Sequence, residues 1–174
     1  LGSGLANRID PKNKKQNARA SGGPKQVSGV KGQAVLLDGE NNLNFPVGRF
    51  RRTDAFTIAL WLRVPERMKP AVFFHRSRAW TDSGSQGYQL LLEDGRLSAS
   101  LIHFWPGNAI RVRSVEPMPV GEWVHVAMTY DGSSKAIGLR IYENGERVLW
   151  GGTQRRGKIW QQKGGSIAEW LDWV

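Results

Sequence analysis

The stretch between residues 56 and 64 limits the possible folds of this chain more than any other feature of the sequence. Every second residue is apolar, and these residues are Phe56, Ile58, Leu60, Leu62 and Val64. The residues between them are Thr57, Ala59, Trp61 and Arg63. A period of two is typical of a β-strand that buries one of its faces. We therefore expect a strand here, with one side packed against a core.

Other short apolar runs follow along the chain, separated by turn residues. They cover residues 34–39, 71–75, 87–104, 109–114, 123–132 and 138–148. Asp94-Gly95 and Asn144-Gly145 lie between apolar runs, and both dipeptides suit tight hairpin turns because they tolerate positive φ. Apart from a turn or two of helix expected near residues 167–174, no helical periodicity is present. The pattern predicts an all-β fold, an antiparallel β-sandwich or jelly roll.

The domain organisation follows from length and local composition. The 174 residues suffice for one substantial core, and no apolar run of about eighteen residues is present to span a membrane. Residues 1–26 are rich in Gly, Asn and Lys and lack the apolar segment of a secretory signal. We expect a flexible basic N-terminal segment over residues 1–26 and a single sandwich over residues 27–174.

The charge of the chain points to an anionic partner. The formal net charge is +10 and arginines outnumber lysines. Arginine offers a planar fork that suits carboxylate, sulfate or phosphate groups, so a polyanion is the expected partner. The alternative is that much of the charge belongs to a solvated tail and a mixed surface. Because cysteine is absent, disulfides, thiolate metal sites, a cysteine nucleophile and covalent c-type haem attachment are excluded within this chain.

Three blocks of the sequence resemble the laminin G-like and pentraxin-like group of concanavalin A-type sandwiches. The blocks are AVLLDGENNLNFP, DAFTIALWLRVP and VGEWVHVAMTYDGSSKAIGLRIYENGERV. The third block has the Gly-x-Trp-x-His-Val strand, the Tyr-Asp-Gly turn and the Tyr-x-Asn-Gly ending of that group. These positions are Gly121, Trp123, His125, Val126, Tyr130, Asp131, Gly132, Tyr142, Asn144 and Gly145. The resemblance covers residues 28–149 and implies a concanavalin A-like, laminin G-like fold.

The segment 74–114 is also similar to the laminin G-like module of planctomycete-type proteins that contain cytochrome c domains. This resemblance implies an extracytoplasmic, non-catalytic accessory module of a multidomain protein, in the periplasm or at the cell surface. The sequence departs from the group after Val148, where the remaining segment is short for the expected closing strands. Ile167, Glu169 and Val174 would stand in for the terminal strand of the group.

A mixture of aromatic rings and arginines between His75 and Ser114 suggests a binding surface. The candidate ligand-binding residues are His75, Arg76, Arg78, Trp80, His103, Trp105, Asn108, Arg111 and Arg113. Flat rings can stack on sugar rings, and guanidinium groups bind acidic groups through two hydrogen bonds. Strand alternation puts Arg111 and Arg113 on one face of their strand.

A purely structural interpretation of the same residues remains open. In that interpretation Trp80 and Trp105 cover the ends of the core. The arginines then pair with acidic residues, for which the candidates are Glu93, Asp82 and Glu116. Trp61 and Trp123 lie in the middle of expected strands, and we expect both in the core.

Catalytic patterns are missing from the sequence. Retaining glycosidases of this fold place carboxylates as Glu-x-Asp-x-x-Glu on one strand face, and no such triplet occurs. The carboxylates of Glu93-Asp94, and those of Glu143 and Glu146, flank hairpin turns instead. The run from Leu101 to His103 resembles a lyase strand, but the partner tyrosine motif is missing. Gly-x-Ser-x-Gly is absent as well. We expect no catalytic residues.

Metal-binding patterns are weak too. The candidate calcium ligands are Asp38, Asp54, Asp82 and Asp131, and each stands beside Gly, Thr or Ser, as turn aspartates commonly do. The three histidines lack the spacing of zinc ligands. We expect no metal site and no cofactor, and calcium is the one cofactor left open.

These observations together predict a non-catalytic carbohydrate-binding module for an anionic polysaccharide. The alternative is a structural or protein-interaction domain that packs against neighbouring domains of a longer extracytoplasmic protein. A polysaccharide lyase or glycosidase is the third hypothesis. Nucleic acid is disfavoured because no RNP-like, KH-like or zinc-finger pattern is present, and no membrane insertion is expected.

Overall fold

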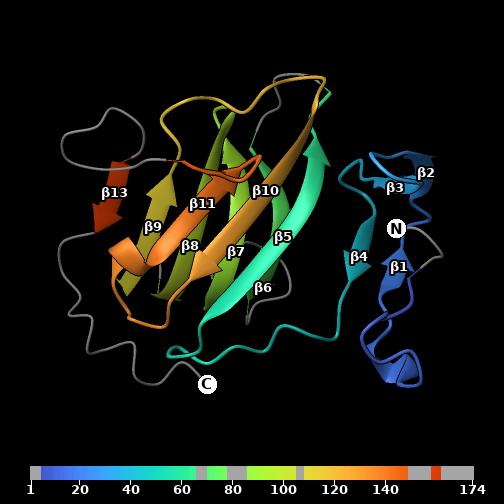
Figure 1. Ribbon diagram of the computed structural model, residues 1–174, viewed down its shortest axis with the longest axis horizontal. Helices are drawn as coiled ribbons and strands as arrows, with labels where there is room; N and C mark the ends of the chain where they lie inside the picture. Colours follow the sequence, from blue (N-terminus) through green and yellow to red (C-terminus); the bar gives the residue numbers. More distant parts are fainter. Residues whose placement is uncertain (1–4, 66–69, 78–85, 105–107, 149–157, 162–174) are drawn as a thin grey trace. The chain divides into compact units, whose positions relative to one another are not determined.

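The computed structural model describes residues 5–65, 70–77, 86–104, 108–148 and 158–161 (Figure 1). These residues belong to two compact units that divide between Arg49 and Phe50. Nearly all regular structure is β-strand, accompanied by two short 3-10 helices, η1 (Lys14–Gln16) and η2 (Ala136–Gly138), within the described ranges. The all-β class expected from the apolar periodicity is therefore confirmed.

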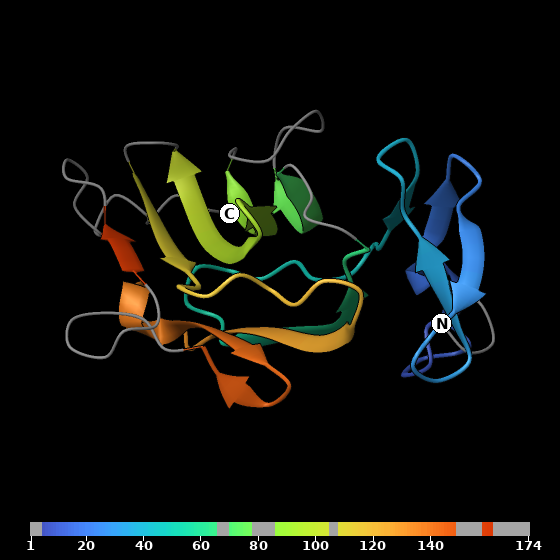
Figure 2. The same ribbon diagram turned by 90° about the horizontal axis from the view of Figure 1, so that it is seen from above.

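Two antiparallel sheets make up the C-terminal unit, residues 50–174. The four-stranded sheet has the order β12 (Glu146–Arg147), β11 (Leu139–Glu143), β10 (Trp123–Tyr130) and β5 (Phe56–Arg63). The five-stranded sheet has the order β13 (Lys158–Gln161), β9 (Asn108–Arg113), β8 (Arg96–Phe104), β7 (Gly87–Glu93) and β6 (Ala71–Ser77). Figure 2 shows the two sheets facing one another as separate layers. The predicted β-sandwich is confirmed.

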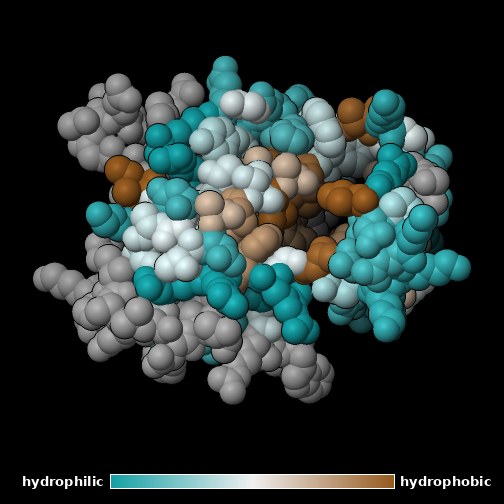
Figure 3. All heavy atoms as spheres, turned by 60° about the horizontal axis from the view of Figure 1, so that its bottom comes forward, coloured by the Kyte–Doolittle hydropathy of each residue, from teal (hydrophilic) through white to brown (hydrophobic). Residues whose placement is uncertain are grey.

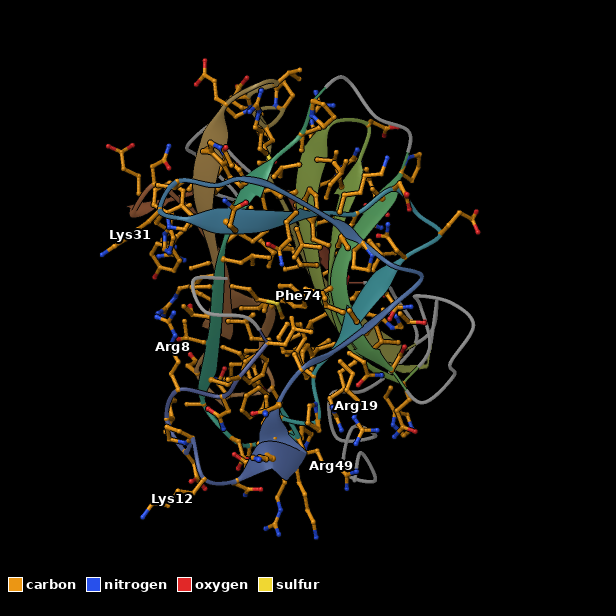
Figure 4. All side chains as sticks on the ribbon, turned by 90° about the vertical axis from the view of Figure 1, so that its right-hand side faces the viewer. Arg8, Lys12, Arg19, Lys31, Arg49 and Phe74 are labelled. Atoms are coloured by element: carbon orange, nitrogen blue, oxygen red, sulfur yellow. The ribbon has the colours of Figure 1, made fainter. Side chains whose placement is uncertain are left out.

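The core lies between these two layers and takes alternate residues from each strand. The fully buried side chains of the core include Leu90, Leu92, Leu97, Ile110 and Val112 on the five-stranded sheet, and Val124, Val126, Met128, Leu139 and Ile141 on the four-stranded sheet. Phe56 and Val64 are buried, as the alternation over residues 56–64 predicts. Phe74, labelled in Figure 4, packs against the same core. Truncating one of the fully buried aliphatic side chains to Ala typically costs about 2–5 kcal/mol.

Both predicted hairpin turns are present. Asp94 and Gly95 have φ values of 49° and 74° and join β7 to β8. Asn144 and Gly145 have φ values of 50° and 85° and join β11 to β12. Positive φ at both central residues is the signature of the hairpin turn whose twist matches that of the flanking strands.

The expectation that Trp61 and Trp123 belong to the core is wrong. Trp61 is 49% exposed. It pairs with His125 across the β5–β10 ladder, while its sequence neighbour Leu62 packs against the core. Trp123 is half-buried and pairs with Arg63, on the same outer face as Trp61. Strand alternation takes precedence over the general tendency of tryptophan to be buried.

The N-terminal unit, residues 1–49, contains short strands and little buried apolar surface. β1 (Arg19–Ser21) pairs with β4 (Asn42–Asn44), and β2 (Lys25–Ser28) pairs with β3 (Gln33–Leu36). In the described part of this unit no apolar side chain is buried, and Ile9, Leu36 and Phe45 are exposed. Hydrophilic residues, drawn in teal, cover most of this unit on the right of Figure 3.

The basic side chains of the N-terminal unit are spread over its surface. Figure 4 shows Arg8, Lys12, Arg19, Lys31 and Arg49 extending outward in different directions. A polyanion is held best where several cationic groups gather on one face. This dispersion favours the interpretation that the charge of the first residues is a solvated surface.

The domain boundary predicted after residue 26 stays a prediction. Deleting residues 1–26 should leave the melting temperature within about 2 °C of the intact chain, because the segment buries no apolar side chain among its described residues. Deleting residues 1–49 in parallel locates the boundary by calorimetry. Loss of stability with only the longer deletion supports a sandwich that begins at residue 27. Unfolding by the shorter deletion would show that the first 26 residues are an integral part of the fold.

A buried tyrosine connects the two segments that flank the four-stranded sheet at one end. The hydroxyl of Tyr130 donates a hydrogen bond to the carbonyl of Arg52 at 2.9 Å and accepts one from the N–H of Ser134 at 2.6 Å. Tyr130 and Ser134 are both buried. Gly132 passes so close to the same segment that an added Cβ would lie 2.4 Å from the carbonyl oxygen of Thr53.

Replacing Tyr130 by Phe should destabilise the protein by about 1–3 kcal/mol, because a buried N–H and a carbonyl lose their partner. Urea unfolding measures the change. Tyr142→Phe is the matched control, since Tyr142 is only half-buried on the outer face of the sheet, and it should cost less than about 0.5 kcal/mol. Equal losses in the two variants would contradict the role assigned to the Tyr130 hydroxyl.

Candidate functional site

Five of the nine sequence-predicted ligand residues have described side chains. His75 and Arg76 lie on β6, His103 on β8, and Arg111 and Arg113 on β9. Arg78, Trp80 and Trp105 lie outside the described residues, and Asn108 begins β9 with its side chain outside the described part.

Strand register brings His75 and Arg111 into one polar row on the outer face of the five-stranded sheet. His75 pairs with Gln89, Gln89 with Ser100, and Ser100 with Arg111. The residues on either side of this row in sequence, such as Leu90 and Ile110, belong to the core. The row therefore faces away from the other sheet and crosses four strands over about 14 Å. We call it the polar row.

The middle of the polar row consists of buried hydrogen-bonding groups. Gln89 and Ser100 are buried although they lie on the outer face, and so is Ser98 in the neighbouring row. Ser98 accepts a hydrogen bond of 2.7 Å from Nε of Arg111. Ser100 is 1% exposed, and its hydroxyl has no hydrogen-bond partner among the described residues. A buried hydroxyl without a partner costs free energy, and at this exposure the hydroxyl of Ser100 is covered in the structure.

Arg111 and Arg113 are paired with acidic groups of the β7–β8 hairpin. Arg111 forms an ion pair with Glu93, in which the side chains are 18% and 25% exposed. Arg113 donates to the carbonyl of Glu93 at 2.8 Å and to the carboxylate of Asp94 at 2.6 Å. Burial, and to a lesser degree the charge of Arg113, lowers the pKa of Arg111. The pairing with Glu93 that the structural interpretation requires is therefore present for Arg111.

Arg76 and His103 do not join the polar row. Arg76 pairs with Tyr88, whose ring belongs to the core, so Arg76 lies on the opposite face from His75. Burial raises the pKa of Tyr88, and the charge of Arg76 opposes that shift. His103 lies where the β8–β9 register shifts, between Ile102 and Phe104, and its Nδ1 atom is buried without a hydrogen-bond partner within the described part of the chain.

Sequence reasoning missed Gln89, Ser98 and Ser100. The signal was present, because a two-residue turn at Asp94-Gly95 fixes which residues of the flanking strands stand opposite each other. That register pairs Gln89 with Ser100 and Leu91 with Ser98, as the structure shows. Alternate polar residues on β8 then indicate that this side of the strand faces away from the core.

The candidate calcium ligands act as turn residues where they are described. Asp38 accepts a hydrogen bond from the N–H of Glu40, and Asp54 accepts one from the N–H of Arg51. Asp131 accepts from the N–H of Ser133, and hydrogen bonding by Ser133 lowers the pKa of Asp131. Asp82 lies outside the described residues.

The described residues contain neither a cluster of metal ligands nor a helix that could span a membrane. Within the described ranges no three His, Cys, Asp or Glu residues gather as metal ligands. The helices of the described part are all too short and too polar to cross a membrane.

The Arg111–Glu93 pair should contribute to stability. Replacing either residue by Ala should cost about 1–3 kcal/mol, because the remaining charge is left partly buried without its partner. The double variant should lose less than the sum of the two single losses, by at least about 0.5 kcal/mol. Urea unfolding of the four proteins provides the measurement.

Arg113→Ala is the comparison variant for this cycle. Its carboxylate partner Asp94 is 76% exposed, so this substitution should cost less than about 1 kcal/mol. Additive losses for Arg111 and Glu93 would show that their ion pair does not stabilise the fold, and would favour a role for Arg111 in binding alone.

Comparison with known proteins identifies the family of the chain. Residues 37–166 match the family model of the concanavalin A-like lectin/glucanases superfamily, of laminin G type. The match covers more than half of the sequence and includes both sheets of the sandwich from β5 to β13. No curated protein matches the sequence. Members of such a family often bind carbohydrate or other proteins.

Proposed function

Because the chain belongs to the concanavalin A-like lectin/glucanases superfamily, we propose that it is a non-catalytic module that binds an acidic polysaccharide. The observation that carries this proposal is the polar row on the outer face of the five-stranded sheet. His75, Gln89, Ser100 and Arg111 stand in register across four strands. The ends of the row, His75 and Arg111, can form hydrogen bonds with hydroxyls of a glycan chain, whereas Gln89 and Ser100 between them are buried.

Arg113 supplies the charge that an acidic sugar would meet. Its carboxylate partner Asp94 is largely exposed, and exposed ion pairs contribute only about 0–1 kcal/mol. A sugar carboxylate or sulfate can therefore replace Asp94 at the guanidinium with little loss. Arg111 differs, because its pair with Glu93 is mostly buried. We assign Arg113 to ligand charge and Arg111 to the support of the surface.

The arrangement of carboxylates supports a non-catalytic role. A retaining glycosidase needs two carboxyl groups about 5 Å apart, and an inverting one about 6.5–9.5 Å apart, on either side of the sugar bond. Glu93 and Asp94 are adjacent at a hairpin turn, and each forms an ion pair with an arginine. Both carboxylates belong to one hairpin turn and pair with arginines there, which favours a structural role for them.

The second candidate function is that of a structural or interaction domain in a longer extracytoplasmic protein. One observation favours it, namely the near-complete burial of Ser98 and Ser100 on an outer sheet face. Under this hypothesis the arginines hold the sheet together and the face does not contact a glycan. The resemblance of residues 74–114 to modules of multidomain proteins is its other support.

Affinity electrophoresis separates the two functions. The protein should be retarded in gels that contain dextran sulfate or polygalacturonate, and not in gels that contain uncharged dextran. Retardation should weaken as salt rises through 0.1 M, where the screening length is about 10 Å. Arg113→Ala should bind at least about threefold more weakly with an unchanged melting temperature.

Lys135→Ala is the matched control, because it removes one exposed positive charge from the loop after β10. Equal weakening by the two variants would reduce the effect to net charge and contradict a site at Arg113. Migration that is the same in all gels would favour the structural domain. Release of reducing ends or unsaturated uronates would overturn the non-catalytic proposal.

A further inference from the structure

We propose that the outer face of the four-stranded sheet is a second glycan-binding surface, on which the indole of Trp61 stacks against the ring of an acidic sugar. This surface lies on the other sheet from the polar row and shares with the proposed function only the class of its ligand. Trp61 is expected in the core from the sequence, whereas its indole is exposed in the structure.

The first observation is the exposure of a large aromatic ring within a strand. Trp61 is 49% exposed, lies two residues before the end of β5 and pairs with His125 in the β5–β10 ladder. Its ring lies edge-on to the ring of His125, with a centroid distance of 5.2 Å and an interplanar angle of 61°. A neighbouring ring restricts the rotamers of the indole before any ligand arrives, so stacking on it costs less conformational entropy.

The second observation is the small size of the side chains beside the indole. Ala59 precedes Trp61 by two residues on the same strand face and pairs with Ala127, which pairs with Tyr142 on β11. Neighbouring rows on one strand face are about 6.5–7 Å apart. The alanines extend little above the sheet, so a low strip separates the indole from Tyr142. Figure 2 shows the β11–β12 hairpin bending away from the five-stranded sheet beside this strip.

The third observation is the sign of the charge on this face. Arg63 is exposed two residues after Trp61, and Arg140 and Arg147 lie on the same face by register with Thr129 and Tyr142. β5 and β10 contain no acidic residue. Among the acidic residues of β11 and β12, Glu143 pairs with the core residue Val126 and therefore lies on the inner side, and Glu146 pairs with Glu143. Consistent with that position, burial raises the pKa of Glu143.

These three observations together favour an acidic sugar as the occupant. The C–H face of a sugar ring is apolar and stacks on an aromatic ring, and its carboxylate or sulfate accepts paired hydrogen bonds from a guanidinium. The positive face disfavours a positively charged partner, and the family match favours a glycan over a single-stranded nucleic acid. Each element of the surface therefore recognises a different part of one sugar unit.

The test uses the full chain, with dextran sulfate and polygalacturonate as probes in affinity electrophoresis. Trp61→Ala should bind at least about tenfold more weakly, and Trp61→Phe should stay within about threefold of the unchanged protein, because the ring is retained. Arg63→Ala should weaken binding to both acidic probes. Ile137→Ala removes another exposed apolar side chain, 59% exposed on η2, and should bind as the unchanged protein does.

The outcomes separate this inference from the proposed function. Losses from Trp61→Ala and Arg113→Ala that add in the double variant support two independent surfaces. Full affinity of Trp61→Ala together with a loss in Arg113→Ala would overturn the inference and leave the proposed function intact. If the unchanged protein binds neither probe, the result contradicts the proposed function, and this inference is overturned with it. Binding of single-stranded poly(dT) that depends on Trp61, without binding of either polysaccharide, would overturn the ligand class.

If Trp61→Ala lowers the melting temperature, the Arg63→Ala variant decides the matter. Arg63 is exposed, so its removal should leave folding unchanged and still weaken binding. If this variant binds both acidic probes as tightly as the unchanged protein does, the assignment of this face is overturned.

Discussion

The burial of one side of every long strand is the constraint on which the rest of this structure depends. Two sheets enclose a single core, so alternate residues of each strand are committed to packing. Apolar burial is the dominant favourable term in folding, and it fixes which side chains face inward. The opposite side of each strand is then free to carry other chemistry. Both surfaces proposed here are made of such outward residues, and their composition does not disturb the core.

The strands and the local hairpins could be predicted from the sequence. Which distant strands pair with each other could not. The alternation over residues 56–64 and the turns at Asp94-Gly95 and Asn144-Gly145 are local patterns, and each appears in the structure as predicted. The pairing of β5 with β10 joins residues that are 60 to 74 positions apart in the sequence, and no local period encodes it. The residues that face each other across that ladder, such as Trp61 and His125, could not be grouped before the structure was known.

The candidate site was predicted in part, for a related reason. A cluster in the sequence is not a cluster on a face, because adjacent residues of a strand point to opposite sides. His75 and Arg111 share a face although three strand spacings separate them, whereas His75 and Arg76 are neighbours that do not. The same rule would have placed Trp61 outside, since it alternates with Leu60 and Leu62. The general tendency of tryptophan to be buried is a weaker signal at this position than the local alternation.

The two outer faces differ in the interactions that a ligand must replace when it binds. On the five-stranded sheet the guanidinium of Arg113 already has a carboxylate partner in Asp94, so an acidic ligand there exchanges one ion pair for another. Such an exchange gives specificity more than affinity, because the gain and the loss are similar. On the four-stranded sheet an indole is exposed to water, and covering it releases that water without breaking an existing contact. Stacking on Trp61 can therefore supply affinity, while the polar row and Arg113 discriminate between ligands of similar size.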